Sequence, residues 1–167
     1  MMGLVAGAGA QHIAKMKMKD VVNSFTKDND TVYVVNFWAT FCKPCNEEIP
    51  YFIKLAEKYK GQKVKLLLVS LDLPEYYPGK IAAFVKKNNY KTNFAWLSES
   101  NADIFCPMID KKWSGAIPAT IIVNNKTGYR KFVEDEMTEL EFETALKLAV
   151  AATKDIYPDP PKSRQPE

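Results

Sequence analysis

The spacing of hydrophobic residues alternates between two periods along the chain, and this alternation is typical of a sheet covered by helices. Two nearly continuous apolar runs, at residues 31–37 (TVYVVNF) and 64–71 (VKLLLVSL), predict strands that are buried on both faces. Between them apolar residues recur at helical spacing, which predicts a helix with one face on the sheet. The apolar positions of that helix are Ile49, Phe52, Ile53 and Ala56. A helix between two strands implies parallel pairing, so the pattern predicts an α/β fold.

The rest of the chain predicts further helices and strands. Helices are expected at residues 17–28 and 81–85, and a short strand at residues 94–97. Residues 119–123 and 129–133 are separated by Asn-Asn-Lys-Thr-Gly and predict an antiparallel hairpin. Thr138 and Glu141 form a capping box that begins the last helix, and Gly61 is expected to end the central one. We therefore expect a central mixed sheet of about five strands with helices on both faces.

Length and composition fit one globular domain. The chain has 167 residues, of which 47% are hydrophobic, and this is enough for a continuous core. Its 23 Lys and Arg against 20 Asp and Glu give a net charge of +3 without a long basic block, which argues against nucleic acid as a partner. No apolar run reaches the ~20 residues of a membrane-spanning helix. We expect a domain over residues 11–154 and a disordered, Pro-rich tail over residues 155–167.

The first ten residues are small or apolar and end in Ala8-Gly9-Ala10, a pattern that signal peptidase cleaves. We interpret residues 1–10 as the remnant of an export signal and predict an extracytoplasmic, periplasmic location. The basic segment that normally opens such a signal is missing, so a disordered terminus or a cloning remnant is the alternative. Cysteine usage does not decide between them, because one close pair and one odd thiol also occur in cytosolic proteins.

Cys42-Lys43-Pro44-Cys45 lies where a predicted buried strand gives way to a helix. Unpaired N–H groups and the dipole at a helix N-terminus stabilise an anion, so we expect the thiol pKa of Cys42 below the usual ~8.5. The i, i+3 spacing brings both sulfurs to one side of the first turn, where they can form a reversible disulfide. Pro44 is tolerated in that turn, and the charge of Lys43 also favours the thiolate.

Two other interpretations of this pair are a structural disulfide and half of a zinc site. A closed zinc site needs four ligands, whereas the chain has three cysteines and one histidine, His12, in the doubtful N-terminal segment. We therefore predict no metal. The third cysteine, Cys106, is expected to be a small buried hydrophobic residue, with a regulatory or intermolecular thiol as the alternative.

Residues 35–45 (VNFWATFCKPC) resemble the active-site segment of the thioredoxin superfamily, in particular its extracytoplasmic reductases of the ResA/TlpA type. The pattern C-x-P-C-x-x-E-x-P continues through Glu48 and Pro50, and residues 115–120 (GAIPAT) resemble the cis-proline segment of the superfamily. The resemblance covers roughly residues 17–153 and implies a thioredoxin-like fold.

The resemblance also implies roles for individual residues. Cys42 would attack as a thiolate and form a mixed disulfide with a substrate protein, which Cys45 would then resolve. Pro118 would be cis and packed beside the cysteines, and Ile117 would offer backbone hydrogen bonds to an extended substrate segment. Many relatives have Trp in place of Phe41 and Thr or another small residue in place of Ile117, which leaves the identity of the substrate open.

Glu48 is a candidate proton acceptor because it lies three residues after Cys45, within reach of that thiol on a helix. Thioredoxin has a buried aspartate six residues before its first cysteine, and this chain has Asn36 there. An amide cannot accept a proton, which strengthens the case for Glu48. The alternative is that Glu48 and Glu47 only stabilise the helix N-terminus electrostatically.

Two tryptophans each have two interpretations. Trp38 either shields the active site or fills the core, and Trp113 either borders a substrate groove or packs in the core. The residues we expect to contact substrate are Trp38, Lys43, Pro44, Ile117 and Pro118.

Other functions on related folds fit less well. A peroxiredoxin-like peroxidase would have Thr three residues before its first cysteine, where this chain has Ala39. A copper-delivery protein of the Sco type would need a C-x-x-x-C pair and a distant histidine. A non-catalytic adaptor would require cysteines buried beyond reach. A disulfide oxidase or isomerase on the same fold is a further alternative, because the direction of exchange depends on the reduction potential.

We therefore predict an enzyme, a thiol-disulfide oxidoreductase that reduces disulfides of exported proteins through Cys42 and Cys45. We expect it to use neither a metal nor an organic cofactor, because the electrons pass through the cysteine pair. Its expected partners are substrate proteins and an upstream thiol donor, which could be membrane-bound, and we expect a monomer.

Overall fold

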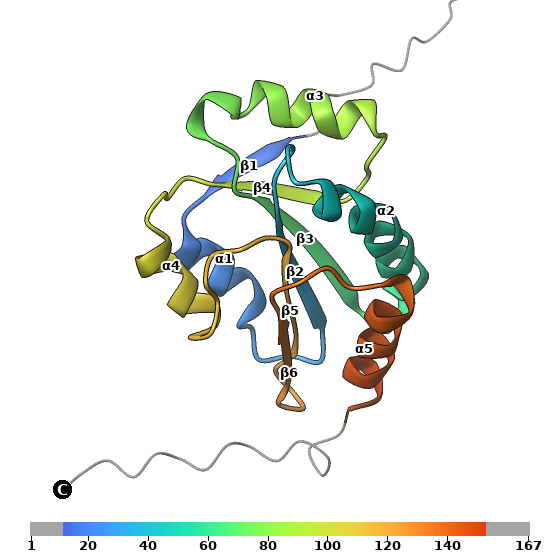
Figure 1. Cartoon of the computed structure of the whole chain (residues 1–167). Coiled ribbons are helices and arrows are strands. Elements are labelled where there is room, and N and C mark those ends of the chain that lie inside the picture. The colour runs from blue at the N-terminus through green and yellow to red at the C-terminus, as the bar shows by residue number, and fades with distance from the viewer. Residues whose placement is uncertain (1–11, 153–167) are drawn as a thin grey trace, which may run out of the picture.

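A six-stranded mixed sheet forms the centre of the protein (Figure 1). The computed structural model describes residues 12–152, so the predictions for residues 1–10 and 155–167 lie outside the described residues. The strands are β1 Ile13–Met16, β2 Val32–Trp38, β3 Val64–Ser70, β4 Asn93–Leu97, β5 Ala119–Asn124 and β6 Tyr129–Val133. Their order across the sheet is β1-β4-β3-β2-β5-β6. The first four run parallel, whereas β5 and β6 each run antiparallel to their neighbours.

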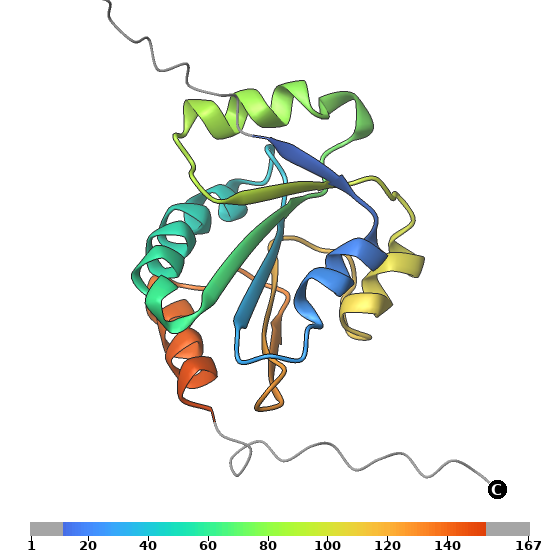
Figure 2. The ribbon, with the colours of Figure 1, turned by 180° about the vertical axis from the view of Figure 1, so that it is seen from behind.

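Helices cover both faces of this sheet, which confirms the predicted α/β architecture (Figures 1 and 2). The helices are α1 Met18–Phe25, α2 Lys43–Lys58, α3 Gly79–Lys87, α4 Ala102–Ile109 and α5 Glu139–Ala151, with short 3-10 turns at Lys60–Gln62 and Pro74–Tyr76. Buried residues of α1 and α4 join one hydrophobic cluster, and those of α2, α3 and α5 join the cluster on the other face. Within residues 12–152, none of these helices is long and apolar enough to cross a bilayer.

The last helix illustrates how the sequence pattern becomes packing. Its capping box forms as predicted, because the Thr138 N–H donates to Glu141 Oε2 at 2.8 Å and the Glu141 N–H donates to Thr138 Oγ1 at 3.3 Å. One turn later Phe142 stacks on Phe52 of α2, with ring centroids 3.7 Å apart and planes within 8°. Both rings are fully buried. α2, which begins at the disulfide segment, and α5 are therefore packed against each other through this aromatic pair.

Three predictions about elements need correction. The sheet has six strands rather than about five, because β1 was not predicted, and α4 was not predicted either. Gly61 does not end the central helix. That helix ends at Lys58, the chain continues into a 3-10 turn, and the left-handed residue that follows is Lys63, with φ of 59°.

The topology brings three separate segments of the chain to one edge of the sheet. β2 and β3 are parallel and in register, so the segments that follow them, with Cys42 and Asp72, start from the same edge. β5 is antiparallel to β2 and pairs Ala119 with Phe37, so it begins at that edge. Pro118 therefore enters the sheet where the disulfide segment leaves it.

Candidate active site

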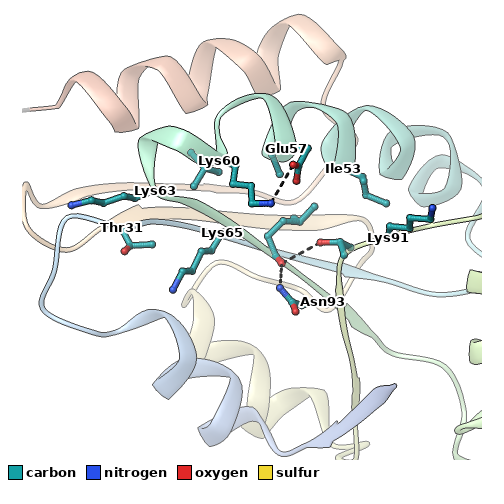
Figure 3. A pocket seen from close by; sticks show the side chains of 12 residues that line it. Thr31, Ile53, Glu57, Lys60, Lys63, Lys65, Lys91 and Asn93 are labelled. Atoms are coloured by element: carbon teal, nitrogen blue, oxygen red, sulfur yellow. Dashed lines mark hydrogen bonds and ion pairs between the residues drawn. The ribbon is translucent and has the colours of Figure 1, made fainter. Parts of the chain in front are cut away.

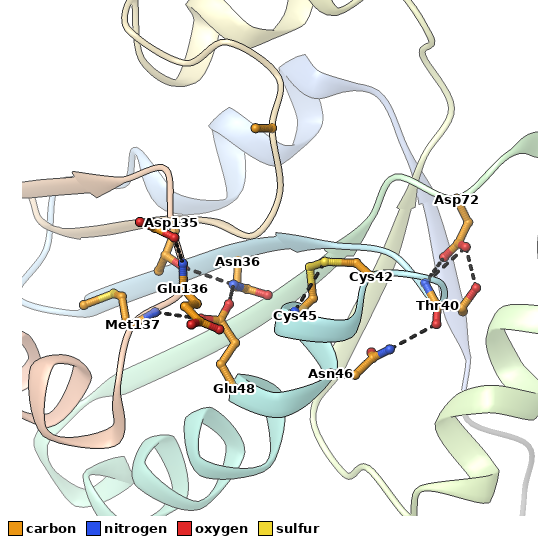
Figure 4. The surroundings of a disulfide bond; sticks show 12 residues. Asn36, Thr40, Cys42, Cys45, Asn46, Glu48, Asp72, Asp135, Glu136 and Met137 are labelled. Atoms are coloured by element: carbon orange, nitrogen blue, oxygen red, sulfur yellow. Dashed lines mark hydrogen bonds between the residues drawn. A yellow bond between two sulfur atoms is a disulfide. The ribbon is translucent and has the colours of Figure 1, made fainter.

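Cys42 and Cys45 form a disulfide at the start of α2, with sulfur atoms 2.02 Å apart (Figure 4). Cys42 is the N-cap residue of the helix, and its Sγ accepts a hydrogen bond from the Cys45 N–H at 3.3 Å. Pro44 occupies the first turn, where a missing N–H removes no intrahelical bond. The helix end thus directs a backbone N–H at the Cys42 sulfur, an arrangement that favours a thiolate there after reduction.

The two cysteines differ in exposure. Cys42 is 8% exposed and Cys45 is completely buried, so a visiting molecule can reach only Cys42. The residues on either side of Cys42 are open to solvent: Phe41 is 69% exposed, and the Lys43 side chain is 87% exposed. Lys43 lies 3.7 Å from Glu47, so its positive charge near the sulfur is partly offset.

Glu48 lies one helical turn after Cys45 and is completely buried. Its Oε1 accepts a hydrogen bond from Asn36 Nδ2 at 2.7 Å, and its Oε2 accepts one from the Met137 N–H at 3.0 Å (Figure 4). Burial raises the pKa of Glu48 from 4.5 to about 7, and the two hydrogen bonds oppose this rise. The carboxyl group therefore exchanges its proton near neutral pH.

The segment that follows β6 is acidic and faces Glu48. Asp135 and Glu136 add to the rise of its pKa by repulsion between like charges. The next residue, Met137, supplies the N–H that binds Glu48, and the hydroxyl of Tyr51 donates to the Met137 carbonyl. This segment thus supplies both one hydrogen-bond donor and part of the negative field around the buried acid.

Asn36 contacts Glu48 directly, which the sequence analysis did not foresee. Its amide nitrogen donates both to Glu48 and to Thr120 Oγ1 of β5, the latter at 3.0 Å. Because Asn36 sits on β2 and Thr120 on the neighbouring strand, the donor is held in place by the sheet. The amide therefore orients the buried carboxylate instead of accepting a proton.

A second polar group fixes the loop before Cys42. The carboxylate of Asp72, which is 3% exposed, accepts hydrogen bonds from the Thr40 N–H at 3.0 Å, the Thr40 hydroxyl at 2.6 Å and the Ser70 hydroxyl at 2.7 Å. On the other side of this loop, Asn46 Nδ2 donates to the Thr40 carbonyl at 3.0 Å. Figure 4 shows this group and the Glu48 group on opposite sides of the disulfide.

The Ile117–Pro118 peptide bond is cis, which confirms that part of the prediction. The segment just before it is held by one carboxylate. Glu134 Oε1 accepts hydrogen bonds from the Ser114 N–H at 2.9 Å, from the Ser114 hydroxyl and from the Ala116 N–H at 3.1 Å. These bonds lower the pKa of Glu134, and the bond from the Ser114 hydroxyl has the largest effect. Glu134 therefore stays ionised at neutral pH.

The structure decides between the alternatives for three other residues. Trp38 is completely buried and packs against Phe84 and Phe94, so it fills the core and cannot contact a substrate in this conformation. Trp113 is 4% exposed and packs on Phe37, which also places it in the core. Cys106 is buried, and this burial raises the pKa of its thiol to about 11. It thus behaves as a small hydrophobic residue.

Sequence reasoning missed Asp72 and Glu134. Asp72 could have been found, because it directly follows the second buried strand and therefore lies at the edge where the cysteine segment begins. Glu134 carries no such signal, since nothing in the local sequence shows that the end of the hairpin turns toward the cis-proline segment.

Known proteins with similar sequences identify the family of this chain. The sequence matches the AhpC/TSA family over residues 9–129, which is well over half of its length. The chain belongs to the AhpC/TSA family. Curated relatives of this AhpC/TSA protein include thiol-disulfide oxidoreductases named ResA. The one from Halalkalibacterium halodurans is 30% identical over 114 residues, which cover 68% of this chain and 60% of that protein. The one from Bacillus subtilis is 28% identical over 105 residues, which cover 63% and 54% respectively.

This AhpC/TSA chain thus spans less than two thirds of the length of these relatives. Solved structures agree on the fold. A thioredoxin-related protein from Neisseria meningitidis serogroup B is 28% identical, with a TM-score of 0.60 over 72% of this chain and 86% of that one. StoA from Bacillus subtilis is 22% identical, with a TM-score of 0.54 over 71% and 84%. The predicted thioredoxin-like fold is confirmed.

Proposed function

We propose that this protein is a thiol-disulfide oxidoreductase that reduces protein disulfides by dithiol-disulfide exchange. The observation that carries the proposal is the Cys42–Cys45 disulfide at a helix N-terminus, in which Cys42 is partly accessible and Cys45 is buried. The relatives named ResA support the same chemistry.

The proposed reaction begins with the reduced pair. The Cys42 thiolate attacks one sulfur of a substrate disulfide, a mixed disulfide forms, and the other substrate sulfur leaves as a thiolate. The Cys45 thiolate then attacks Cys42 Sγ, closes the disulfide between the two residues and releases the second substrate sulfur. Two electrons pass to the substrate, and a dithiol donor returns the pair to its reduced form. The difference in exposure supports this order, because only Cys42 can meet a protein substrate.

Glu48 is the proposed acceptor of the Cys45 proton. A buried thiol must lose its proton before it can attack, and no water reaches Cys45 from the surface, since its side chain is completely buried. An acid-base group works best when its pKa lies near the working pH, and the pKa of Glu48 is about 7. The buried carboxylate one helical turn from Cys45 meets both requirements.

We further propose an extracytoplasmic location, substrates that are exported proteins, an upstream thiol donor and a monomeric state. The signal-like pattern Ala8-Gly9-Ala10 and the family resemblance support the location. For the substrate, we propose that an extended segment pairs with the backbone of Ile117 beside the cis bond, while Lys43 and Pro44 border the sulfur. Exposed Phe41 adds an apolar contact next to Cys42.

Reduction of insulin by the purified protein with a dithiol donor tests the proposal. We expect turnover in the wild type, none in Cys42→Ser, and wild-type rates in the control Cys106→Ala, whose thiol is buried away from the pair. Undiminished turnover in Cys42→Ser would overturn the mechanism. Absence of turnover in the wild type would favour a non-catalytic adaptor, and consumption of peroxide would favour a peroxidase.

A further inference from the structure

A hollow lined by described residues lies at the opposite edge of the sheet from the disulfide. It encloses about 590 Å³ between the second half of α2 and the start of β3, within the size range of small-molecule sites (Figure 3). Thr31, Lys63 and Asn93, which line it, adjoin the N-terminal ends of β2, β3 and β4. Because Cys42 follows the C-terminal end of β2, the hollow is separate from the candidate active site.

The charge of this hollow is strongly positive. Its lining includes one carboxylate, Glu57, and four lysines: Lys60, Lys63, Lys65 and Lys91. Figure 3 shows the lysines spread along the hollow, with Lys63 and Lys65 at one end and Lys91 at the other. The protein as a whole carries only +3, so this small area concentrates positive charge that the rest of the chain balances.

Within the described residues, two of the four ammonium groups have a carboxylate partner. Lys60 lies 3.3 Å from Glu57, and Lys63 lies 2.6 Å from Asp30. Across residues 12–152, neither Lys65 nor Lys91 forms an ion pair. Both are exposed residues that line the hollow, with Lys65 on β3 and Lys91 just before β4. An anionic ligand that extends along the hollow would therefore meet two lysines without such an ion pair.

Polar groups inside the hollow are also available. Thr31 lines the hollow and is only 7% exposed, and its hydroxyl can donate a hydrogen bond to a ligand or accept one from it. Asn93 Nδ2 donates to the Leu66 carbonyl at 3.4 Å, a long bond that a stronger acceptor could replace. The wall between these groups is apolar and consists of Ile53, Ala56, Val64 and Leu66.

We propose that this hollow binds a small organic molecule that carries a multivalent phosphate group. The phosphate would lie among the lysines that line the hollow, where the Thr31 hydroxyl and the Asn93 amide are further donors, while the organic part packs on the apolar wall. Phosphate fits this hollow because lysine ammonium groups bind phosphate as point charges. The several oxygens of a phosphate group can also accept hydrogen bonds from donors on different sides. The site does not depend on the redox chemistry of Cys42, so it stands or falls independently of the proposed function.

Binding of tripolyphosphate to the full chain, followed by amide NMR shifts, tests the proposal. We expect saturable binding that shifts Thr31, Val64 and Asn93 and weakens with added salt. The variant Lys65→Glu/Lys91→Glu should lose about tenfold or more in affinity, because two attractive charges become repulsive. The matched control Lys111→Glu/Lys112→Glu changes two exposed lysines at the end of α4 by the same charge and should retain the affinity.

Three results would overturn the proposal. Equal losses in the two double variants would mean diffuse attraction to a positive protein instead of a site. Shifts confined to amides outside the hollow would place the anion elsewhere. Binding to vesicles of anionic phospholipid without binding to tripolyphosphate would mean that the lysines meet a lipid surface instead of a soluble molecule. Circular dichroism of both variants checks that each remains folded.

Discussion

The buried carboxyl of Glu48 should make the stability of the oxidised protein fall as pH rises through neutrality. Burial raises its pKa from 4.5 to about 7. Between these values the folded protein keeps the proton, whereas the unfolded chain has already lost it. Because the unfolded state binds fewer protons, the free energy of unfolding falls with rising pH in this window. At about 1.4 kcal/mol per pH unit, the loss amounts to about 3 kcal/mol and is complete just above pH 7.

The variant Glu48→Gln isolates this effect, because glutamine has a similar shape and does not titrate. Urea unfolding of the oxidised wild type and variant is measured from pH 4.5 to pH 8, and the difference between them is followed. We expect the free energy of unfolding of the variant to rise by about 3 kcal/mol relative to that of the wild type across this range. All other titrating groups are the same in the two proteins, so their contributions cancel in the difference. The neighbouring Glu47→Gln is the control: its side chain is exposed, so it lacks the burial that opposes the charge of Glu48, and the gain of about 3 kcal/mol should be absent. A constant difference for Glu48→Gln, or one of opposite slope, would refute the reasoning.

Three further changes test other contacts. Phe142→Ala removes the ring stacked on Phe52 and should lower the free energy of unfolding by about 3–5 kcal/mol in urea titrations. Asp72→Ala leaves the Thr40 N–H, the half-buried Thr40 hydroxyl and the buried Ser70 hydroxyl without their acceptor, so thermal and urea unfolding should show a loss of about 2–3 kcal/mol. Glu134→Gln weakens the hold on the cis-proline segment, so in the insulin assay KM should rise while kcat stays near the wild-type value, and Glu134→Asp should restore part of the loss.

The elements that follow one clear hydrophobic period could be predicted from the sequence. β2 and β3 are apolar runs bounded by polar residues, and α5 begins at a capping box that the structure reproduces. β1 has only four residues, too few to establish a period, and it is defined by pairing with β4, far away in the sequence. α4 is eight residues long and contains Pro107, so its helical signal is weak even though Asn101 caps it.

The same division applies to the candidate site. Cys42 and Cys45 are recognisable from the sequence because they lie three positions apart, and because the helix that begins at Cys42 is indicated by the residues directly around them. The environment of Glu48 is not local: its two hydrogen-bond donors come from Asn36 and Met137, which are 12 and 89 residues away. A pKa depends on burial and on such distant partners, so no pattern along the chain could have given its value.

Stability and the proposed proton transfer make opposite demands on Glu48. An exposed glutamate at this point of α2 would ionise without cost to folding, but its pKa would remain near 4.5, too low to take a proton efficiently from a thiol at neutral pH. Burial raises the pKa to about 7, and the same burial destabilises the folded protein once the carboxylate is charged. The hydrogen bonds from Asn36 and Met137 limit that loss without removing it. The gain in stability expected for Glu48→Gln and the expected loss of the proposed proton transfer are therefore two consequences of one buried position.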